Sequence, residues 1–203
     1  FILIARDHMC PPVLEDIAKK KNFPVFSSYA TTSSLMVELM SFLEEQLAPS
    51  VSVHGVLMNL YGTGVLIKGK SSMGKSEIAL ELIQKGHLLV SDDRVDIKRV
   101  HNTIQGEAPD IIRDMLEVRG VGILNIVDLY GVHSTMPKCR LDFIVELEQW
   151  NPLKDYTRVG IEENIYETYF GIPVPKLILP VSGGRSIATI IESAVVNYML
   201  KKR

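Results

Sequence analysis

Apolar and polar residues follow two different periods in alternating stretches of the chain. Strand-like segments rich in apolar residues lie at residues 1–5, 24–26, 51–61, 64–69, 88–90, 141–147 and 175–181. Between several of these runs, apolar residues recur every three or four positions, as they do on one face of a helix. Strands that alternate with helices along a chain are typical of α/β proteins. The pattern therefore predicts an α/β domain.

A helix expected over residues 33–49 divides this pattern into two parts. Ser33 or Ser34 offers an N-cap, after which leucine and methionine recur at helical spacing. The preceding strand, helix and strand are too few for a core of their own, and the chain does not begin with methionine. We therefore expect residues 1–32 to be the tail of an otherwise missing N-terminal domain, followed by a linker helix and a main domain over residues 50–203.

The composition is that of a folded protein without a strong electrostatic bias. Of the 203 residues 46% are hydrophobic and 23% charged, and the formal net charge is −2, which gives no broad attraction for nucleic acid or an anionic membrane. No apolar run approaches the roughly 20 residues that span a bilayer. The two cysteines lack the spacing of a disulfide framework or a zinc site. We expect a cytoplasmic protein that binds neither nucleic acid nor membrane.

The strongest motif is GKSSMGKS, which fits the G-x-x-x-x-G-K-S pattern of a phosphate-binding loop, or P-loop. It stands between a strand-like run and an amphipathic helix, which is the context that such a loop requires. Backbone N–H groups and the positive helix end would hold phosphate oxygens, Lys75 would neutralise the terminal phosphates, and Ser76 could bind Mg²⁺. The expected ligand is a nucleoside triphosphate or pyrophosphate. The P-loop comprises Gly69, Lys70, Ser71, Ser72, Met73, Gly74, Lys75 and Ser76.

Three further groups could supply chemistry beside the P-loop. A short strand would return Asp92 and Asp93 to it, where one could act as a base and the other hold water, metal or backbone. A solvated turn is the alternative for this pair. His54 is either a structural strand residue or part of the site. Glu117 and Arg119, in a glycine-rich segment, could face a charged ligand or form a surface pair.

Five motifs taken together resemble the HPr kinase/phosphorylase family of bacteria. In chain order they are HGV, GKSSMGKSE, SDDRVDI, EVRGVGILNI and IPVPKLILPVSGGRS. The resemblance implies that residues 50–203 form a P-loop catalytic domain. Its fold would be an α/β kinase core similar to that of phosphoenolpyruvate carboxykinase, with a mixed central sheet flanked by helices. The resemblance also implies a homohexamer.

The resemblance further implies a reaction and a cellular role. Members of the family phosphorylate a serine of HPr, the small phosphocarrier of bacterial sugar uptake, using Mg²⁺ with ATP or pyrophosphate as the phosphoryl donor. They also run the reverse phosphorolysis, in which inorganic phosphate attacks the phosphoserine and pyrophosphate is formed. The implied role of this chain is in carbon catabolite regulation.

The same resemblance assigns roles to individual residues. The catalytic residues would be His54, Lys75, Asp92 and Arg158. The metal site would be formed by Ser76, Glu117 and Asp93. The residues that face the protein substrate would be Arg119, Pro180, Ser182, Gly184 and Arg185. Asp92 would accept the serine proton in the kinase reaction and, by microscopic reversibility, donate it in phosphorolysis.

The chain departs from the family pattern at three serines. Ser72 stands where glycine is usual in the P-loop, and a residue with a side chain is costly there if the position needs a positive φ. Ser182 stands where a basic residue is usual and Ser186 where asparagine is usual, and both departures bear on phosphorolysis.

Two other functions stay open. One is a non-catalytic nucleotide switch, which would bind ATP only to move a partner surface and would need no catalytic base. The other is a small-molecule kinase or a carboxykinase relative, which would need a pocket of its own for a sugar or a carboxylate.

Overall fold

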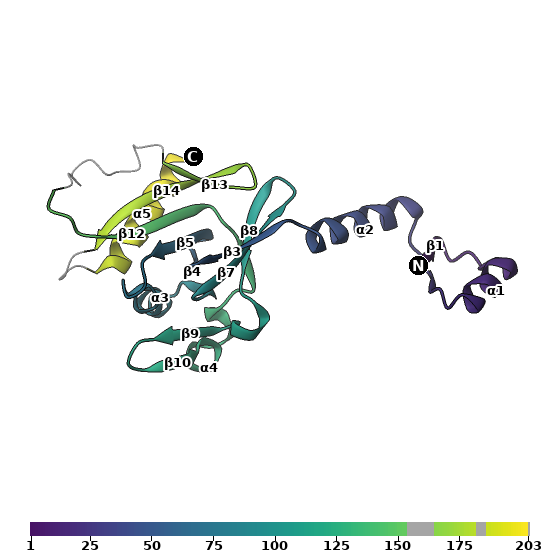
Figure 1. Cartoon of the computed structure of the whole chain (residues 1–203), viewed down its shortest axis with the longest axis horizontal. Coiled ribbons are helices and arrows are strands. Elements are labelled where there is room, and N and C mark those ends of the chain that lie inside the picture. Colours follow the sequence, from purple (N-terminus) through teal and green to yellow (C-terminus); the bar gives the residue numbers. More distant parts are fainter. Residues whose placement is uncertain (154–164, 182–185, 203) are drawn as a thin grey trace. The chain divides into compact units, whose positions relative to one another are not determined.

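The computed structural model describes residues 1–153, 165–181 and 186–202 (Figure 1). The chain forms two compact units, Phe1–Ala48 and Pro49–Arg203. Within the described part of the chain, no helix is both long and apolar enough to cross a membrane.

The first unit contains two short strands and two helices. Strands β1 (Ile2–Ile4) and β2 (Val25–Ser27) pair in parallel, and helix α1 (Pro12–Lys20) connects them. Helix α2 follows over Thr32–Gln46.

The N-cap of α2 is Thr31, so the prediction that Ser33 or Ser34 caps this helix was wrong. Thr31 has extended backbone angles, and its side chain accepts a hydrogen bond of 3.2 Å from the Ser34 N–H. Four consecutive hydroxyl residues could all serve as caps. Sequence alone does not distinguish them, because the backbone conformation decides which side chain reaches the first free N–H groups.

The second unit is built on a six-stranded mixed sheet, as predicted. Its strand order is β13-β14-β12-β5-β4-β6, in which β5, β12 and β14 run parallel and the other neighbours are antiparallel. The strands are β4 (Val56–Leu60), β5 (Thr63–Gly69), β6 (Leu88–Ser91), β12 (Phe143–Gln149), β13 (Tyr166–Tyr169) and β14 (Ile172–Val181). The first two of these strands form an antiparallel hairpin.

Smaller elements surround this sheet. A four-stranded antiparallel sheet has the order β11-β8-β7-β3 and comprises β3 (Ser50–His54), β7 (Arg94–Val100), β8 (Thr103–Glu107) and β11 (Lys138–Arg140). A separate antiparallel hairpin is formed by β9 (Met115–Val118) and β10 (Gly122–Asn125). The short helices are α4 (Ile126–Tyr130) and two 3₁₀ turns, Asp110–Ile112 and Val132–Ser134.

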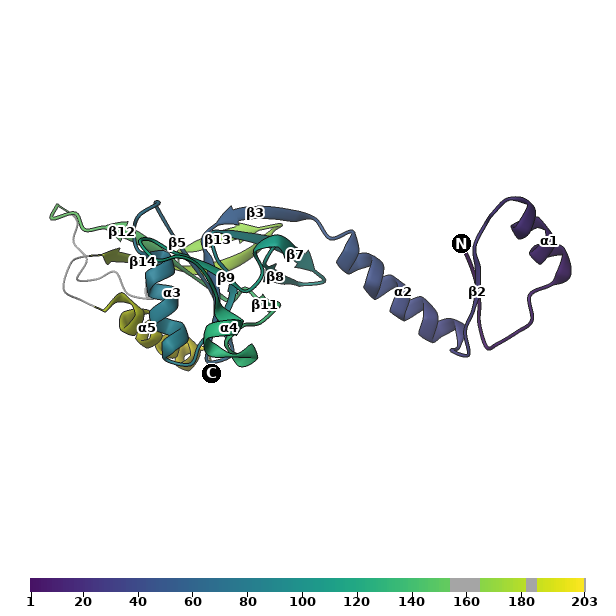
Figure 2. The ribbon, with the colours of Figure 1, turned by 90° about the horizontal axis from the view of Figure 1, so that it is seen from below.

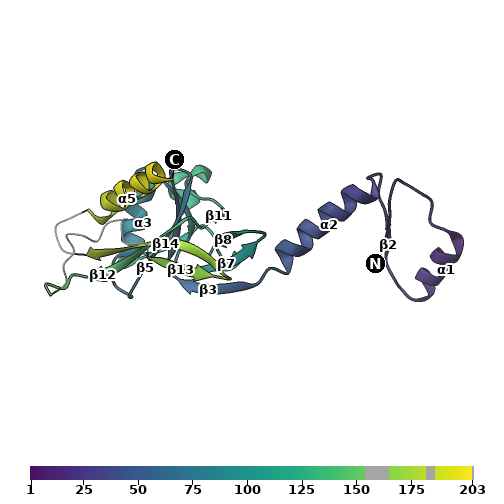
Figure 3. The same ribbon diagram turned by 90° about the horizontal axis from the view of Figure 1, so that it is seen from above.

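The large sheet is covered by helices on one face and by the small sheet on the other (Figures 2 and 3). Helices α3 (Lys75–Gln84) and α5 (Ile187–Lys201) pack on the side chains of Val56, Met58 and Val65, among others. The alternate strand residues Leu57 and Leu66 face the opposite way and pack on β7 and β8. The expectation of helices flanking the sheet therefore holds for one face only.

Gly55 separates β3 from β4, although the sequence pattern predicted one strand over residues 51–61. The two strands belong to different sheets. A Cβ on Gly55 would lie only 2.8 Å from the carbonyl oxygen of Ile67, so the backbone can cross between the sheets only without a side chain at this position. The break places His54 at the end of β3, beside the P-loop.

Candidate active site

The P-loop connects the end of β5 to the first turn of α3, as the motif predicted. Gly74 is the N-cap of α3 and has a φ of +78°, a conformation that favours glycine. Lys75 is buried, and its ammonium group donates to the carbonyl oxygens of Gly69 at 3.1 Å and Lys70 at 3.2 Å. The lysine therefore curls back over the loop, where it can reach a bound phosphate.

Ser72 adopts a left-handed backbone conformation, which costs free energy for a residue that has a side chain. Its φ is +69°, and its hydroxyl donates to the carbonyl oxygen of Ser71. This local hydrogen bond offsets part of the strain that a Cβ brings to left-handed backbone.

Asp92 lies directly after β6 and reaches the start of α3. Its carboxylate oxygens are 3.1 and 3.2 Å from the Ser76 hydroxyl, and one of them accepts the backbone N–H of Glu117 at 2.9 Å. The side chain is buried. Burial raises the pKa of the Asp92 carboxyl, while the hydrogen bonds from Glu117 and Ser76 act in the opposite direction.

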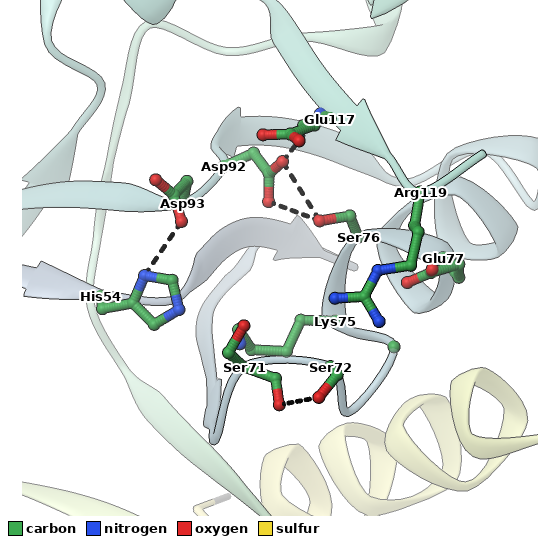
Figure 4. A pocket seen from close by; sticks show the side chains of 11 residues that line it. His54, Ser71, Ser72, Lys75, Ser76, Glu77, Asp92, Asp93, Glu117 and Arg119 are labelled. Carbon is green, nitrogen blue, oxygen red and sulfur yellow. Dashed lines mark hydrogen bonds and ion pairs between the residues drawn. The ribbon is translucent and has the colours of Figure 1, made fainter. Parts of the chain in front are cut away.

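Asp93 points away from Asp92 and toward β3 (Figure 4). One of its carboxylate oxygens lies 3.0 Å from Nδ1 of His54. Asp93 has a φ of +64°, and its carbonyl oxygen accepts the Gly55 N–H at 3.1 Å. The tight turn after β6 thus sends the two adjacent carboxylates to different partners and holds the imidazole beside the cavity.

The β9–β10 hairpin brings Glu117 and Arg119 to the same cavity, and Arg119 extends from it toward the P-loop (Figure 4). Glu77, in the first turn of α3, also lines the cavity and was missed by sequence reasoning. Its position directly after the P-loop motif was the available signal, because the start of a helix that follows such a loop must face the ligand.

These groups enclose a cavity of about 200 Å³. Its lining consists of glycine and polar or charged residues: His54, Ser71, Ser72, Gly74, Lys75, Ser76, Glu77, Asp92, Asp93, Glu117 and Arg119. Pro180, at the end of β14, is not among them. The predicted residues Arg158, Ser182, Gly184 and Arg185 lie outside the described residues.

The cavity offers oxygen ligands for a metal ion. The Ser76 hydroxyl and the carboxylate of Glu117 fit Mg²⁺, which prefers oxygen ligands and keeps several waters. Over the described ranges, His, Cys, Asp and Glu side chains form no group of three or more that could hold a metal by themselves. The donor set therefore fits an ion that also takes ligands from a bound phosphate and from water.

A glycine-containing loop that joins a buried strand to a helix N-terminus, with a lysine and hydroxyls facing one cavity, is the arrangement typical of phosphate-binding α/β proteins. Residues 45–203 match the family model described as HPr Serine kinase C-terminal domain. The chain belongs to this family.

Curated relatives are similar in sequence to this chain over nearly its whole length. The HPr kinase/phosphorylase of Alkaliphilus metalliredigens is 44% identical over 202 residues, and that of Halalkalibacterium halodurans is 45% identical over 202 residues. Each alignment covers 99% of this chain but 65% of the relative, so the chain spans about two thirds of the length of these proteins.

A solved structure shares the fold. The HPr(Ser) kinase/phosphatase of Coxiella burnetii is 30% identical, with a TM-score of 0.69 over 75% of this chain and 92% of that chain.

Proposed function

We propose that this chain contains the catalytic part of a bifunctional HPr serine kinase/phosphorylase. It would transfer a phosphoryl group from ATP or pyrophosphate to a serine of HPr, and reverse the reaction with inorganic phosphate to give pyrophosphate. The names of the relatives support HPr as the protein substrate. The observation that carries the proposal is the buried Asp92 carboxylate, held against the first turn of the P-loop helix.

Asp92 is placed to act as the general base. A base must come within about 3 Å of the proton that it removes, and its pKa should lie closer to neutral than that of an exposed carboxylate. Burial moves the pKa of Asp92 in this direction. In the forward reaction the serine proton passes to Asp92 while the serine oxygen bonds to phosphorus and the bond from phosphorus to the donor breaks. In phosphorolysis an oxygen of inorganic phosphate bonds to phosphorus, the bond from phosphorus to the serine oxygen breaks, and protonated Asp92 returns the proton to that serine oxygen.

The transferring phosphoryl group would be stabilised by groups on three sides of the cavity. Lys75 supplies a positive charge from the P-loop, and His54 supplies a ring nitrogen from β3. Arg119 adds a guanidinium from the β9–β10 hairpin. We retain Arg158 as a further catalytic cation on the basis of the family resemblance.

We propose that Mg²⁺ is held by Ser76 and Glu117, with Asp93 contributing its charge to the same site. The Asp93 carboxylate contacts His54, so its effect on the metal is electrostatic in this arrangement. When bound, the ion would neutralise the negative charge of the phosphate oxygens. Ser76 and Glu117 also orient Asp92, which receives hydrogen bonds from both residues.

The remaining assignments follow from the family resemblance. We propose that Arg119, Pro180, Ser182, Gly184 and Arg185 face HPr. We further propose a core similar to that of phosphoenolpyruvate carboxykinase, a homohexameric assembly, and a cytoplasmic role in carbon catabolite regulation. Light scattering at several protein concentrations tests the hexamer, because a monomer mass throughout would contradict it.

Asp92→Asn tests the assigned base. Asparagine keeps the shape of the side chain and can still accept a hydrogen bond, but it does not take up the serine proton. The rate of serine phosphorylation with ATP, Mg²⁺ and HPr should fall at least about 100-fold. The affinity for nucleotide, measured by calorimetry, should stay within about threefold of the wild-type value.

Asp128→Asn, at an exposed position in the first turn of α4, is the matched control and should keep wild-type activity. Unchanged transfer in Asp92→Asn would rule out Asp92 as the base. Nucleotide binding without any transfer by the wild-type protein would favour the non-catalytic switch.

A further inference from the structure

Four polar side chains meet in a cluster between α5, the end of α3 and the β4–β5 turn. At its centre is Glu192 of α5, whose side chain is mostly buried. One of its carboxylate oxygens accepts a hydrogen bond of 2.6 Å from the Lys85 ammonium group. The other accepts one of 3.2 Å from the Tyr61 hydroxyl and lies 2.9 Å from Nε2 of His87. These four residues are termed the distal clamp.

The surroundings of Glu192 hold the clamp in one arrangement. Burial acts to raise the pKa of its carboxyl, but the hydrogen bonds from the other three clamp residues lower this pKa below its ordinary value, so the group is ionised at neutral pH. His87 is buried, and its imidazole packs edge-on against the Tyr61 ring with 4.7 Å between the ring centroids. A buried network whose polar groups all have partners is rigid.

The clamp joins the far ends of the three elements that lead to the active site. Tyr61 precedes β5, which ends in the P-loop. Lys85 is the C-cap of α3, whose first turn carries Ser76. His87 precedes β6, which is followed directly by Asp92. Each of β5, α3 and β6 therefore has one end at the cavity and the other end at the clamp.

Helix α5, which carries Glu192, is fastened to α3 at a second place, and the two helices lie side by side (Figure 2). The hydroxyl of Ser186, the N-cap of α5, donates to Oε1 of Glu81 at 2.6 Å. Lys85 donates a further hydrogen bond of 2.7 Å to the Thr189 hydroxyl. A shift of α5 along α3 would break several of these bonds, so α5 holds α3 in position.

We propose that Glu192 is a positioning residue for phosphoryl transfer: through the distal clamp it fixes β6 relative to α3, and so holds Asp92 against Ser76 and within reach of the serine hydroxyl. This inference rests on the proposed function. The P-loop binds phosphate through its own backbone N–H groups, so loss of the clamp should leave phosphate binding intact. The transfer step needs the base at hydrogen-bond distance, and a displacement of about 1 Å can slow a reaction about 100-fold.

Glu192→Ala tests the clamp in the reaction of HPr with pyrophosphate and Mg²⁺. The kcat should fall about tenfold or more, while the KM for pyrophosphate stays within about twofold of the wild-type value. Glu192→Gln keeps the length of the side chain and an oxygen that can accept the Lys85 hydrogen bond, so it should recover most of the lost kcat. A raised KM with unchanged kcat, or equal losses of kcat in the two variants, would overturn the positioning role.

Val195→Ala is the control for a general loss of stability. Val195 lies on the same helix, is buried in the core between the helices and the large sheet, and has no contact with the clamp among the hydrogen bonds and ion pairs described above. Urea unfolding compares the stability of this variant with that of Glu192→Ala. Unchanged kcat in Val195→Ala would support the positioning role, whereas an equal loss of kcat in both variants would assign the effect to stability alone.

Lys85→Met tests whether the clamp residues act as a unit. In the wild-type protein this substitution should lower kcat about threefold or more. Added to Glu192→Ala, it should lower kcat by less than about twofold further, because the hydrogen bond between the two residues is already lost. Losses that multiply as they do for independent sites would contradict the clamp. Absence of transfer to HPr by the wild-type protein, with either donor, would instead contradict the proposed function itself.

Discussion

At the scale of single residues, the site depends on two neighbouring aspartates with different surroundings. Asp92 is buried against Ser76 and the Glu117 backbone, whereas Asp93 is exposed and contacts His54. The residue pattern predicted that one of the two would act as a base and left open which one, whereas the family resemblance assigned this role to Asp92. Burial, which only the folded structure reveals, is what distinguishes them.

The raised pKa of Asp92 predicts a pH-dependent stability difference. Because the folded state binds this proton more tightly than the unfolded state, the contribution of Asp92 to stability is fully present below about pH 4 and is lost as pH rises through its folded pKa. Asp92→Asn should therefore gain stability relative to wild type between pH 4 and pH 7. Urea unfolding of both proteins at pH 4 and pH 7, without nucleotide or Mg²⁺, measures this difference in stability.

The control for this experiment is Asp128→Asn, which removes one exposed carboxylate. A loss of stability of Asp92→Asn relative to wild type as pH rises would contradict the sign, and hence the burial of this carboxylate.

Ser72→Gly tests the strain in the P-loop. Glycine adopts a φ of +69° without the penalty of a Cβ, so the variant should be more stable by about 0.5 to 1 kcal/mol and bind pyrophosphate at least as tightly. Ser71→Gly is the matched control, because Ser71 lacks a positive φ and should gain no stability. Equal effects of the two substitutions in urea unfolding would argue against a strained Ser72.

At the scale of elements, the sequence predicted the strands of the large sheet apart from β13, but neither most of the small sheet nor how the sheets are joined. The P-loop and its flanking strand and helix could be predicted from local sequence pattern. The break at Gly55 could not, since the reason for it is the carbonyl oxygen of Ile67 on another strand. The roles assigned to residues 154–164 and 182–185 stay predictions.

Gly55→Ala tests this crossing between sheets. The added Cβ would meet the Ile67 backbone, so unfolding free energy should fall by about 2 to 3 kcal/mol and activity should fall with it as His54 shifts. Gly62→Ala meets no atom within 4 Å but has a φ of +82°, and should cost about 1 kcal/mol with activity retained. The same activity loss in both variants would contradict a specific role for Gly55.

At the scale of the whole molecule, the second unit is a layered core of helices, mixed sheet and small sheet. Cys139 on β11 is buried between the two sheets, and this burial raises the pKa of its thiol to about 12. Cys10, the other cysteine, is partly exposed in the first unit.

Thiol labelling therefore reports on the integrity of the layered core. At pH 8 a disulfide reagent should react rapidly with Cys10 and only at the rate of unfolding with Cys139, because a thiol with so high a pKa forms little thiolate. In urea both thiols should react rapidly. Cys10→Ser isolates the slow thiol, and rapid labelling of this variant in buffer would contradict the packing of the small sheet on the large one.

The most direct test of the account is the reversibility of phosphate transfer to HPr. Wild-type protein with ATP and Mg²⁺ should form phosphoserine on HPr, as detected by mass spectrometry. Removal of ATP and addition of inorganic phosphate should then release one pyrophosphate for each phosphoserine lost. A protein that binds ATP but yields neither phosphoserine nor pyrophosphate would contradict the proposed function.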